Sequence, residues 1–493
     1  MVEFQKCGIM SLVGNYAGRD FVGRKLKIVL SDLHLGAGYA QAGGNCLEDF
    51  VADEPLAQFL REIEREAELD QREVELIING DLFEFLQIPA VAKFDPTEVY
   101  PREAYLDSSA EASVKRLNII IEGHQEIFSA LSDFMHVEAP KRRITIIKGN
   151  HDVNLFWPGV KSRLREVLGA SGARASLLLF AEEFVSREKI YVEHGHQRAE
   201  KMNSYRDFLD PRLPGDPTQL YYPAGSHFVI NVFNEIERER WFVDSIKPLT
   251  ALIWFAFQWD FNLAASMLKS FIAHTPALVV SNFAPHAEEA VSGNTLLQYL
   301  ETADKRLQMS EQYSSDPSFR RQFHQQIQRY LDDAHVANQS NAAFSEADIG
   351  SNPLEMGQAE QNRQRASLRQ AAAEIARQEG AKVILFGHSH HPVYEALDGD
   401  GVYINTGCWL WKQDLSGVPI ETWEALFKDP QKNVDIPGRL PYARIDYDED
   451  DDPIAQLLDF ANKNASFQAR EDQAGNFFSR VLNRIVAPTR SEE

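Results

Sequence analysis

The chain has 493 residues, of which 44% are hydrophobic and 25% are charged, so its composition is that of a globular protein and not of a disordered or fibrous one. Its formal net charge of -23 repels polyanions and argues against non-specific binding to long nucleic acid. Three cysteines, Cys7, Cys46 and Cys408, give no disulfide framework, and the first residues lack the pattern of a secretory signal. We therefore expect a cytoplasmic protein.

Five short runs rich in Val, Ile and Leu predict buried strands, and each is followed by a polar motif. They lie at residues 26–31, 74–79, 143–148, 189–193 and 382–386. Helical periodicity separates them, first over residues 54–68 and then in a pattern that includes Leu117, Ile120, Ile127 and Leu131. Strands that alternate with helices predict an α/β core.

The alternation stops after about residue 203 and returns at residue 382, with further strand-like runs at 402–405 and 442–447. One core split by a long helical insertion explains this pattern better than two tandem domains. We therefore expect a first core part (25–205), a mainly helical insertion that covers the active-site mouth (206–375) and a second core part (376–447). Within the insertion, the polar stretch 338–364 is expected to be loop. Residues 448–493 are expected to form an acidic linker, which marks a boundary at 448–452, and an amphipathic tail.

The insertion contains an aromatic stretch over residues 241–271 that allows two interpretations. The simpler one is buried packing of the insertion, and the alternative is an apolar lid for a lipid-like substrate or a peripheral membrane contact. The same region holds the most apolar window of the chain, residues 249–268. Gln258, Asp260 and Asn262 lie near its middle and argue against a membrane-spanning helix.

Each of the five predicted strands is followed by side chains that bind metals. In chain order the motifs are Ser31-Asp32-Leu33-His34, Gly80-Asp81-Leu82-Phe83-Glu84, Gly149-Asn150-His151-Asp152, His194-Gly195-His196 and Gly387-His388-Ser389-His390. Because the carboxyl ends of strands converge at the edge of a sheet, ligands that are distant in sequence can share one site. Carboxylate, imidazole and amide donors together suit divalent metals such as Mn, Fe or Zn.

This ordered set of motifs resembles the calcineurin-like metallophosphoesterase superfamily, over about residues 25–205 and 376–447. Within that superfamily the segments SDLHL and GDLFEFL are most similar to the UDP-2,3-diacylglucosamine diphosphatase-like branch. The chain departs from that diphosphatase at His151, where the diphosphatase has Arg, and at His196, where it usually has Asp. The resemblance implies a four-layer α/β/β/α metallophosphoesterase sandwich with a long helical insertion.

The resemblance also implies two divalent metal ions, with manganese expected first and iron, zinc or magnesium as alternatives. The first ion would be held by Asp32, His34, Asp81 and His390. The second ion would be held by Asp81, Asn150, His194 and His388, so that Asp81 bridges the two. Ions placed in this way acidify a shared water to hydroxide and neutralise the phosphoryl oxygens as charge builds up.

Further side chains of these motifs are candidates for catalysis and substrate binding. We expect His151 to protonate the leaving oxygen, with Asp152 orienting its ring. Glu84 either touches the site or caps the turn after its strand. Candidate substrate contacts, each weighed against a structural or solvated role, are His196, Arg198, Lys201 and Arg206.

The expected function is metal-dependent hydrolysis of a phosphodiester or pyrophosphate bond in a phosphorylated small molecule or a nucleotide- or lipid-linked substrate. A nuclease or cyclic-nucleotide phosphodiesterase on the same site is the alternative, and the acidic net charge disfavours the nuclease. A non-catalytic scaffold of the same fold ranks last, because scaffolds lose ligands and every expected ligand is present here. The motifs point to no particular oligomeric state.

Overall fold

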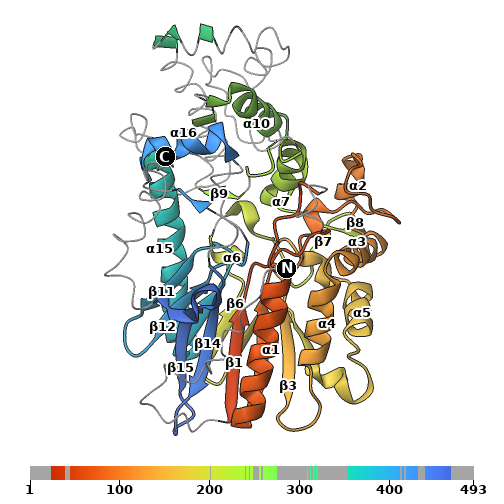
Figure 1. The fold of residues 1–493 in the computed structure, drawn as a ribbon, viewed down its shortest axis with the longest axis vertical. Helices are drawn as coiled ribbons and strands as arrows, with labels where there is room; N and C mark the ends of the chain where they lie inside the picture. Colours follow the sequence, from red (N-terminus) through yellow and green to blue (C-terminus); the bar gives the residue numbers. More distant parts are fainter. Residues whose placement is uncertain are drawn as a thin grey trace, which may run out of the picture.

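The computed structural model describes residues 24–38, 45–199, 201–238, 259–274, 353–410, 418–430 and 439–467, with shorter pieces between 240 and 256, 308 and 319, and 413 and 415. Its centre consists of two mixed β-sheets (Figure 1). The larger sheet has seven strands in the order β16-β15-β14-β1-β2-β3-β4, and the smaller has five in the order β11-β12-β10-β6-β5. The chain therefore has a mixed α/β fold.

The larger sheet is parallel over four strands, which are β1 (Lys25–Leu30), β2 (Glu73–Asn79), β3 (Arg142–Ile147) and β4 (Leu178–Ala181). Antiparallel strands extend it beyond β1, namely β14 (Pro441–Tyr447), β15 (Pro453–Asp459) and β16 (Ala465–Ser466). The smaller sheet has three parallel strands, β6 (Ile190–Glu193), β10 (Val383–Phe386) and β12 (Val402–Thr406), between the antiparallel edge strands β5 (Phe184–Arg187) and β11 (Pro392–Ala396).

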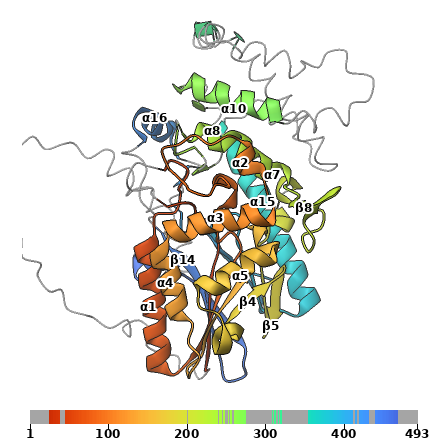
Figure 2. The ribbon, with the colours of Figure 1, turned by 90° about the vertical axis from the view of Figure 1, so that its right-hand side faces the viewer.

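Alternation along the strands divides the buried side chains into layers. In β1, Ile28 packs in the cluster that includes the helices on the outer face of the larger sheet, whereas Val29 packs in the cluster between the two sheets. Four helices cover that outer face, namely α1 (Asp53–Asp70), α3 (Ala110–Gly123), α4 (Gln125–Phe134) and α5 (Pro158–Val167) (Figure 2). The long helix α15 (Pro353–Glu379) packs on the outer face of the smaller sheet through Leu368, Ala372 and Ile375.

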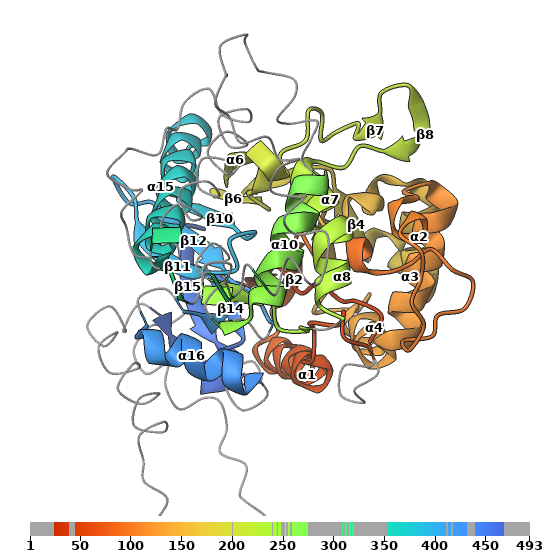
Figure 3. The same ribbon diagram turned by 90° about the horizontal axis from the view of Figure 1, so that it is seen from above.

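A group of helices, called here the helical cap, lies beyond the carboxyl ends of the strands (Figures 1 and 3). It consists of α7 (Ala224–Phe228), the π-helix Val229–Phe233, α8 (Asn234–Ile236), α10 (Phe261–His274) and α16 (Ile420–Lys428). A separate apolar cluster holds it together, in which Phe255 and Leu263 pack with Trp423. The side chain of Asn234 donates to the Leu86 carbonyl at 2.9 Å, which ties the cap to the turn that follows β2.

Short elements complete the described chain. They are α2 (Glu103–Leu106), α6 (His196–Ala199), the hairpin of β7 (Arg212–Leu213) and β8 (Asp216–Leu220), the two-stranded pair of β9 (Ile246–Lys247) and β13 (Gln413–Asp414), and short 3-10 helices. Among the residues that the structure describes, no helix has the length and apolar character needed to cross a membrane.

The seven predicted strand runs and the helix over residues 54–68 are present, with ends that shift by one or two residues. The second helical pattern is two helices, because the chain breaks at His124, whose buried ring pairs with Asp53 at 2.8 Å. In the aromatic stretch, Phe242, Phe255 and Phe261 are buried in the cap, as the packing interpretation predicts. Trp254 and Phe257 lie outside the described residues, as does the amphipathic tail.

Two predicted boundaries are wrong, those at residues 375 and 447. The polar stretch 338–364 is not loop throughout, because α15 begins at Pro353 and belongs to the layer on the smaller sheet rather than to the insertion. The acidic run 448–452 is the turn between β14 and β15, so the core sheet continues past residue 447 to Ser466. Helix α16 lies in the predicted second core part, yet it packs with the helical cap. The insertion also contains the β7–β8 hairpin, which its helical pattern did not predict.

Candidate metal centre

Five loops that carry the predicted ligands leave the carboxyl ends of β1, β2, β3, β6 and β10. The first three strands belong to the larger sheet and the other two to the smaller one, so the ligands converge from both sheets. Backbone hydrogen bonds hold the loops together directly above the strands. His34 N–H donates to the Asp81 carbonyl at 2.9 Å, and Gly387 N–H donates to the His194 carbonyl at 2.9 Å.

The backbone of these loops is strained at the ligands themselves. A positive φ occurs at five predicted ligand residues, which are Asp32 (53°), His34 (48°), Asp81 (49°), His388 (66°) and His390 (58°). This left-handed region is uncommon for residues with a side chain, and each such residue costs on the order of 1–3 kcal/mol. Strain of this kind persists where the surrounding structure holds it, and it is concentrated at functional sites. Five cases at predicted ligand positions therefore make this region a candidate functional site.

Two glycines let the loops approach one another closely. A Cβ on Gly80 would overlap the ring of His194, and a Cβ on Gly149 would overlap the carboxylate of Asp81. Gly80 also has a φ of 80°, which favours glycine. Glycine therefore precedes Asp81 and Asn150 for a steric reason, because it leaves room for a ligand from another loop.

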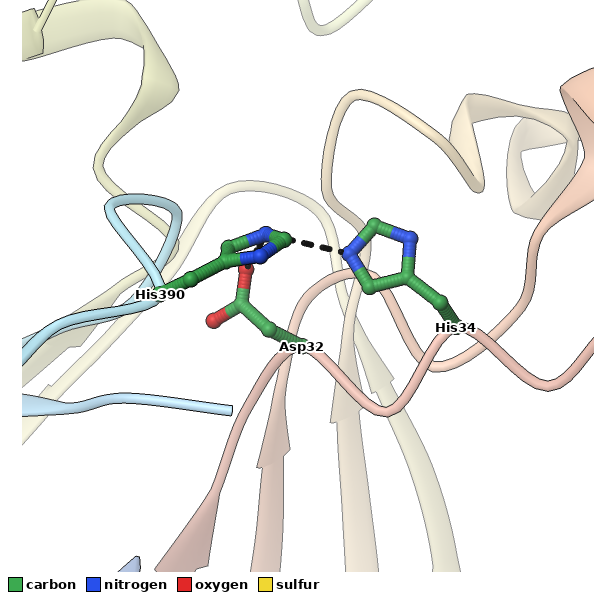
Figure 4. A group of neighbouring side chains, drawn as sticks. All are labelled: Asp32, His34 and His390. Atoms are coloured by element: carbon green, nitrogen blue, oxygen red, sulfur yellow. Dashed lines mark hydrogen bonds and ion pairs between the residues drawn. The ribbon is translucent and has the colours of Figure 1, made fainter. Parts of the chain in front are cut away.

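The first group of converging donor atoms belongs to Asp32, His34 and His390 (Figure 4). The Nε2 atom of His34 lies 3.2 Å from Nε2 of His390, which lies 3.2 Å from Oδ1 of Asp32. Ligands at about 2.0–2.1 Å from one tetrahedral ion stand roughly 3.3 Å apart. The spacing of these donor atoms therefore fits a single divalent ion.

The second group contains Asp81, His194 and His388, with Asn150 beside it. The Nε2 atom of His194 lies 3.1 Å from Oδ2 of Asp81 and 3.2 Å from Oδ1 of Asn150. The same Oδ2 of Asp81 lies 3.7 Å from Nε2 of His34, so one oxygen faces both groups. The other oxygen, Oδ1, accepts the His151 N–H at 2.8 Å. A bridge through the single oxygen Oδ2 therefore fits this geometry.

Hydrogen bonds to the far side of two rings fix which nitrogen faces the site. His194 donates through Nδ1 to the Asn79 carbonyl at 2.9 Å, and His34 lies with Nδ1 at 2.8 Å from Oε2 of Glu84. In the neutral form of each ring Nε2 would then carry the lone pair, and this atom is directed at the donor groups. Partners of this kind orient metal-binding histidines and raise their basicity.

The charges of the buried side chains also fit the binding of divalent cations. Burial raises the pKa of Asp32, but the charge and hydrogen bond of His390 and the charge of His194 together outweigh it and hold the pKa at about 2. At Asp81 burial is likewise outweighed, chiefly by His194, and the pKa lies well below its usual value. Burial lowers the pKa of His194, yet the Asp81 charge raises it to about 10. Divalent ions would replace these imidazole protons as partners of the carboxylates, and metal binding characteristically releases protons in this way.

One buried atom supports the same conclusion. Among the described residues no hydrogen bond of good geometry reaches Oδ2 of Asp81, although the side chain is fully buried. The ion pair with His194 at 3.1 Å offsets part of the cost of burying this oxygen, and a bound metal is the other partner that buried charges normally take. The donor set and this oxygen together fit a centre for two divalent ions.

His151 lies next to the ligands and is oriented by Glu84. Its Nδ1 atom stands 2.6 Å from Oε2 of Glu84, the same oxygen that His34 contacts. The His151 side chain is 19% exposed, whereas Glu84 is buried, so the ring is accessible from solvent. Burial raises the pKa of Glu84, but His151 and then His34 lower it to about 2. Glu84 also caps the turn that follows, because Oε1 accepts the Leu86 N–H at 3.1 Å.

The expectation that Asp152 orients the His151 ring is wrong. The Asp152 carboxylate accepts the Gly149 N–H at 2.5 Å and the Leu82 N–H at 2.8 Å, and it joins the second and third ligand loops. Burial and the neighbouring Asp81 charge raise the pKa of Asp152 to about 7. The Asp152 side chain binds the backbone of two loops and not the neighbouring His151 ring. Glu84, from the loop after β2, is the carboxylate that orients this ring.

The four candidate substrate contacts fall in different environments. His196 is 1% exposed and packs against Phe208 with ring centroids 4.5 Å apart, and burial holds its pKa well below the usual value. The guanidinium of Arg198 donates to Glu193 at 3.1 Å, so it is already paired. Exposed Arg206 lies over the Tyr221 ring, and the side chain of Lys201 is outside the described residues. The described contacts therefore give no cluster of cations for a second phosphate.

Sequence reasoning also missed supporting residues of the site. Tyr205 donates through its hydroxyl to the Asn150 carbonyl at 3.1 Å, and no motif singles it out. Glu84 was not missed, because the sequence analysis expected it either to touch the site or to cap the turn after its strand, and it does both. Comparison with protein-family models and with curated protein sequences found no match to this chain.

Proposed function

We propose that the chain is a two-metal phosphoesterase that hydrolyses a phosphodiester or pyrophosphate bond. The observation that carries the proposal is the pair of donor groups that share one oxygen of Asp81. Asp81 would contribute to both ions, and pairs of divalent ions are used for in-line displacement at phosphorus. Bound ions would lower the pKa of a water and neutralise the phosphoryl oxygens.

The layered fold supports the same assignment. Helices, the larger sheet, the smaller sheet and α15 follow one another, and this order supports our proposal of the four-layer α/β/β/α sandwich that the resemblance to calcineurin-like metallophosphoesterases implies. In this proposal the first ion is held by Asp32, His34, Asp81 and His390, and the second by Asp81, Asn150, His194 and His388. Manganese is the ion that we propose first, with iron, zinc or magnesium as alternatives.

Residues of the chain supply the proton chemistry. His151 is the proposed general acid, because its ring is partly exposed beside the first donor group while its Nδ1 is held by Glu84. With Nδ1 occupied, Nε2 is the atom that can pass a proton to the oxygen of the leaving group. Glu84 is a positioning residue, since it orients both this ring and the metal ligand His34 through one oxygen.

The helical cap bears on the choice of substrate. It lies beyond the ligand loops and contacts the turn after Glu84 through Asn234. We propose that it selects the substrate and takes no part in bond cleavage. A phosphorylated small molecule or a nucleotide- or lipid-linked phosphate fits an acidic chain better than long nucleic acid does.

The proposal is tested by hydrolysis assays on metal-stripped protein that is reloaded with one metal at a time. The substrates are bis-aryl phosphates, mono-aryl phosphates and nucleoside-diphosphate lipids. We expect turnover of a bis-aryl phosphate with at least one metal and its loss on chelation. If no substrate is hydrolysed with any of the four metals by a protein that binds them, the proposed function is wrong.

A further inference from the structure

The first ligand loop, residues 31–38, is held beyond its metal ligands by the side chain of Glu48. Backbone hydrogen bonds join its earlier part, up to Leu35, to the second ligand loop. After Leu35 the partner changes, because Gly36 N–H donates to Oε1 of Glu48 at 3.3 Å and Gly38 N–H donates to Oε2. One carboxylate therefore binds the backbone of the loop at the two glycines that follow the ligands in sequence.

Glu48 is fully buried, and His124 is its charged partner. The Nε2 atom of His124 lies 3.5 Å from Oε2 of Glu48, and Nδ1 lies 2.8 Å from Oδ1 of Asp53. Burial lowers the pKa of His124, but the charge of Glu48 and the contact with Asp53 outweigh it and raise the pKa to about 10. His124 is therefore an imidazolium at neutral pH, and it supplies the positive charge that a buried carboxylate requires.

The same part of the loop packs against the end of α3 with no room for a side chain. A Cβ on Gly38 would overlap Gly123, and a Cβ on Gly123 would overlap the Ala37 carbonyl. Gly38 also has a φ of 73°, which favours glycine. Gly123 directly precedes His124, at which α3 ends, so the backbone contact and the ion pair come from adjacent residues.

These contacts bear on the metal ligands because the ligands lie between two fixed parts of the loop. Asp32 and His34 have φ values of 53° and 48°, a region that persists where the surrounding structure holds it. Among the described residues, neither Glu48 nor His124 forms a hydrogen bond or ion pair with any of the other four ligand loops. Their effect should therefore be confined to the ion that Asp32 and His34 would bind.

We propose that Glu48, neutralised by His124, is a positioning residue that holds the first ligand loop in its metal-binding conformation and thereby sets the affinity of the first ion. It touches neither the ion nor the substrate, and it acts through the backbone at Gly36 and Gly38. Glu84 differs from it in orienting the ring of a ligand rather than the backbone. The inference rests on the metal centre of the proposed function and not on the reaction that the centre catalyses.

Glu48→Gln tests the proposal, because it keeps the size of the side chain and removes its charge. Oε1 accepts from Gly36 and Phe50. Oε2 accepts from Gly38 and lies against His124. Either orientation of the new amide therefore places its NH2 group against two donors. By calorimetric titration of metal-stripped protein with manganese, we expect one of the two ions to bind about tenfold more weakly and the other to bind with native affinity.

Two further variants identify the affected ion and control for stability. In Asp32→Ala, which lacks a ligand of the first ion, adding Glu48→Gln should leave the affinity of the remaining ion unchanged. Glu75→Gln is the matched control, because Glu75 is also a buried carboxylate, paired with Lys27 at 2.8 Å, and has no hydrogen bond or ion pair with a ligand loop among the described residues. It should lower the melting temperature and keep both affinities.

A milder variant keeps the test decisive if Glu48→Gln does not fold. Asp53→Asn removes a charge beside His124 at a side chain that is 32% exposed, and it should weaken the same ion by about twofold to fourfold. Native affinity for both ions in the folded variant, or an equal loss in Glu75→Gln, would overturn the inference while leaving the proposed function intact. If one ion is weakened selectively but no phosphodiester is hydrolysed by the native chain, the proposed function fails and the positioning role stands.

Discussion

Substitution of Glu84 by Gln should affect both metal binding and catalysis, because one oxygen, Oε2, contacts the metal ligand His34 and the proposed acid His151. In the native chain Oε2 accepts from His34 and His151, and Oε1 accepts from Leu86 N–H. Gln keeps one oxygen and places an NH2 group at the other position. The less costly orientation keeps the oxygen toward the two imidazoles and turns the NH2 group toward the Leu86 N–H, where two donors then face each other.

The size of the effect follows from the loss of charge. Hydrogen bonds to a charged acceptor contribute about 1.5–3 kcal/mol and neutral ones about 0.5–1.5 kcal/mol, so each imidazole loses on the order of 1 kcal/mol. Residues that orient metal ligands typically change metal affinity or activity by about 10–100-fold. For Glu84→Gln we expect metal affinity to fall about tenfold. At saturating metal we expect a further loss of about tenfold on an alkyl phosphodiester and little loss on a nitrophenyl diester.

Metal titration and a leaving-group series on the same variant measure both effects. The control is Glu111→Gln, which changes an exposed glutamate on α3 and should leave both quantities at the native level. Normal metal affinity combined with an equal, small loss across all leaving groups would refute the reasoning. Glu84 would then act only as the cap of the turn at Leu86.

The remaining predictions concern the ligands and their loops. Asp81→Ala should lose both ions because Asp81 faces both donor groups, whereas Asp32→Ala should mainly weaken one, and metal content after desalting measures the difference. Gly149→Ala should also lose metal, since its Cβ would overlap the Asp81 carboxylate, while Gly159→Ala in α5 meets only an ordinary contact and should retain it. His151→Gln should keep both ions and lose about 10²–10⁴ in rate on alkyl diesters but much less on nitrophenyl esters. Equal loss across the leaving-group series would make His151 a structural residue.

The strands that carry ligands were predictable because their side chains are buried on both faces. Val29 packs between the sheets and Ile28 packs under the helices, so the run is continuously apolar and easily recognised. The edge strand β5 has only Val185 buried, so it does not stand out from the surrounding chain. Strand β15 is mostly apolar, but it follows directly on the acidic run 448–452, which was interpreted as a boundary. The acidic run 448–452 was wrongly interpreted as a linker, because a tight turn and a linker have similar polar compositions.

Long-range partners in the site could not be read from sequence. Motif order indicated which residues converge, since carboxyl ends of strands meet at sheet edges. Which carboxylate reaches the His151 ring depends on the path of the loop after β2, and it is Glu84 rather than the adjacent Asp152. The pairing of Arg198 with Glu193 likewise needed the structure, because a basic residue after a ligand motif is equally compatible with phosphate binding.

The central claim is that one catalytic centre requires two divalent ions. The most direct test is a titration of metal-stripped protein with manganese while hydrolysis of a bis-aryl phosphodiester and bound metal are followed together. The account predicts two ions bound per chain, with full activity reached only when the second is bound, because Asp81 faces both donor groups. Full activity with one ion per chain, or hydrolysis that persists without metal, would contradict it.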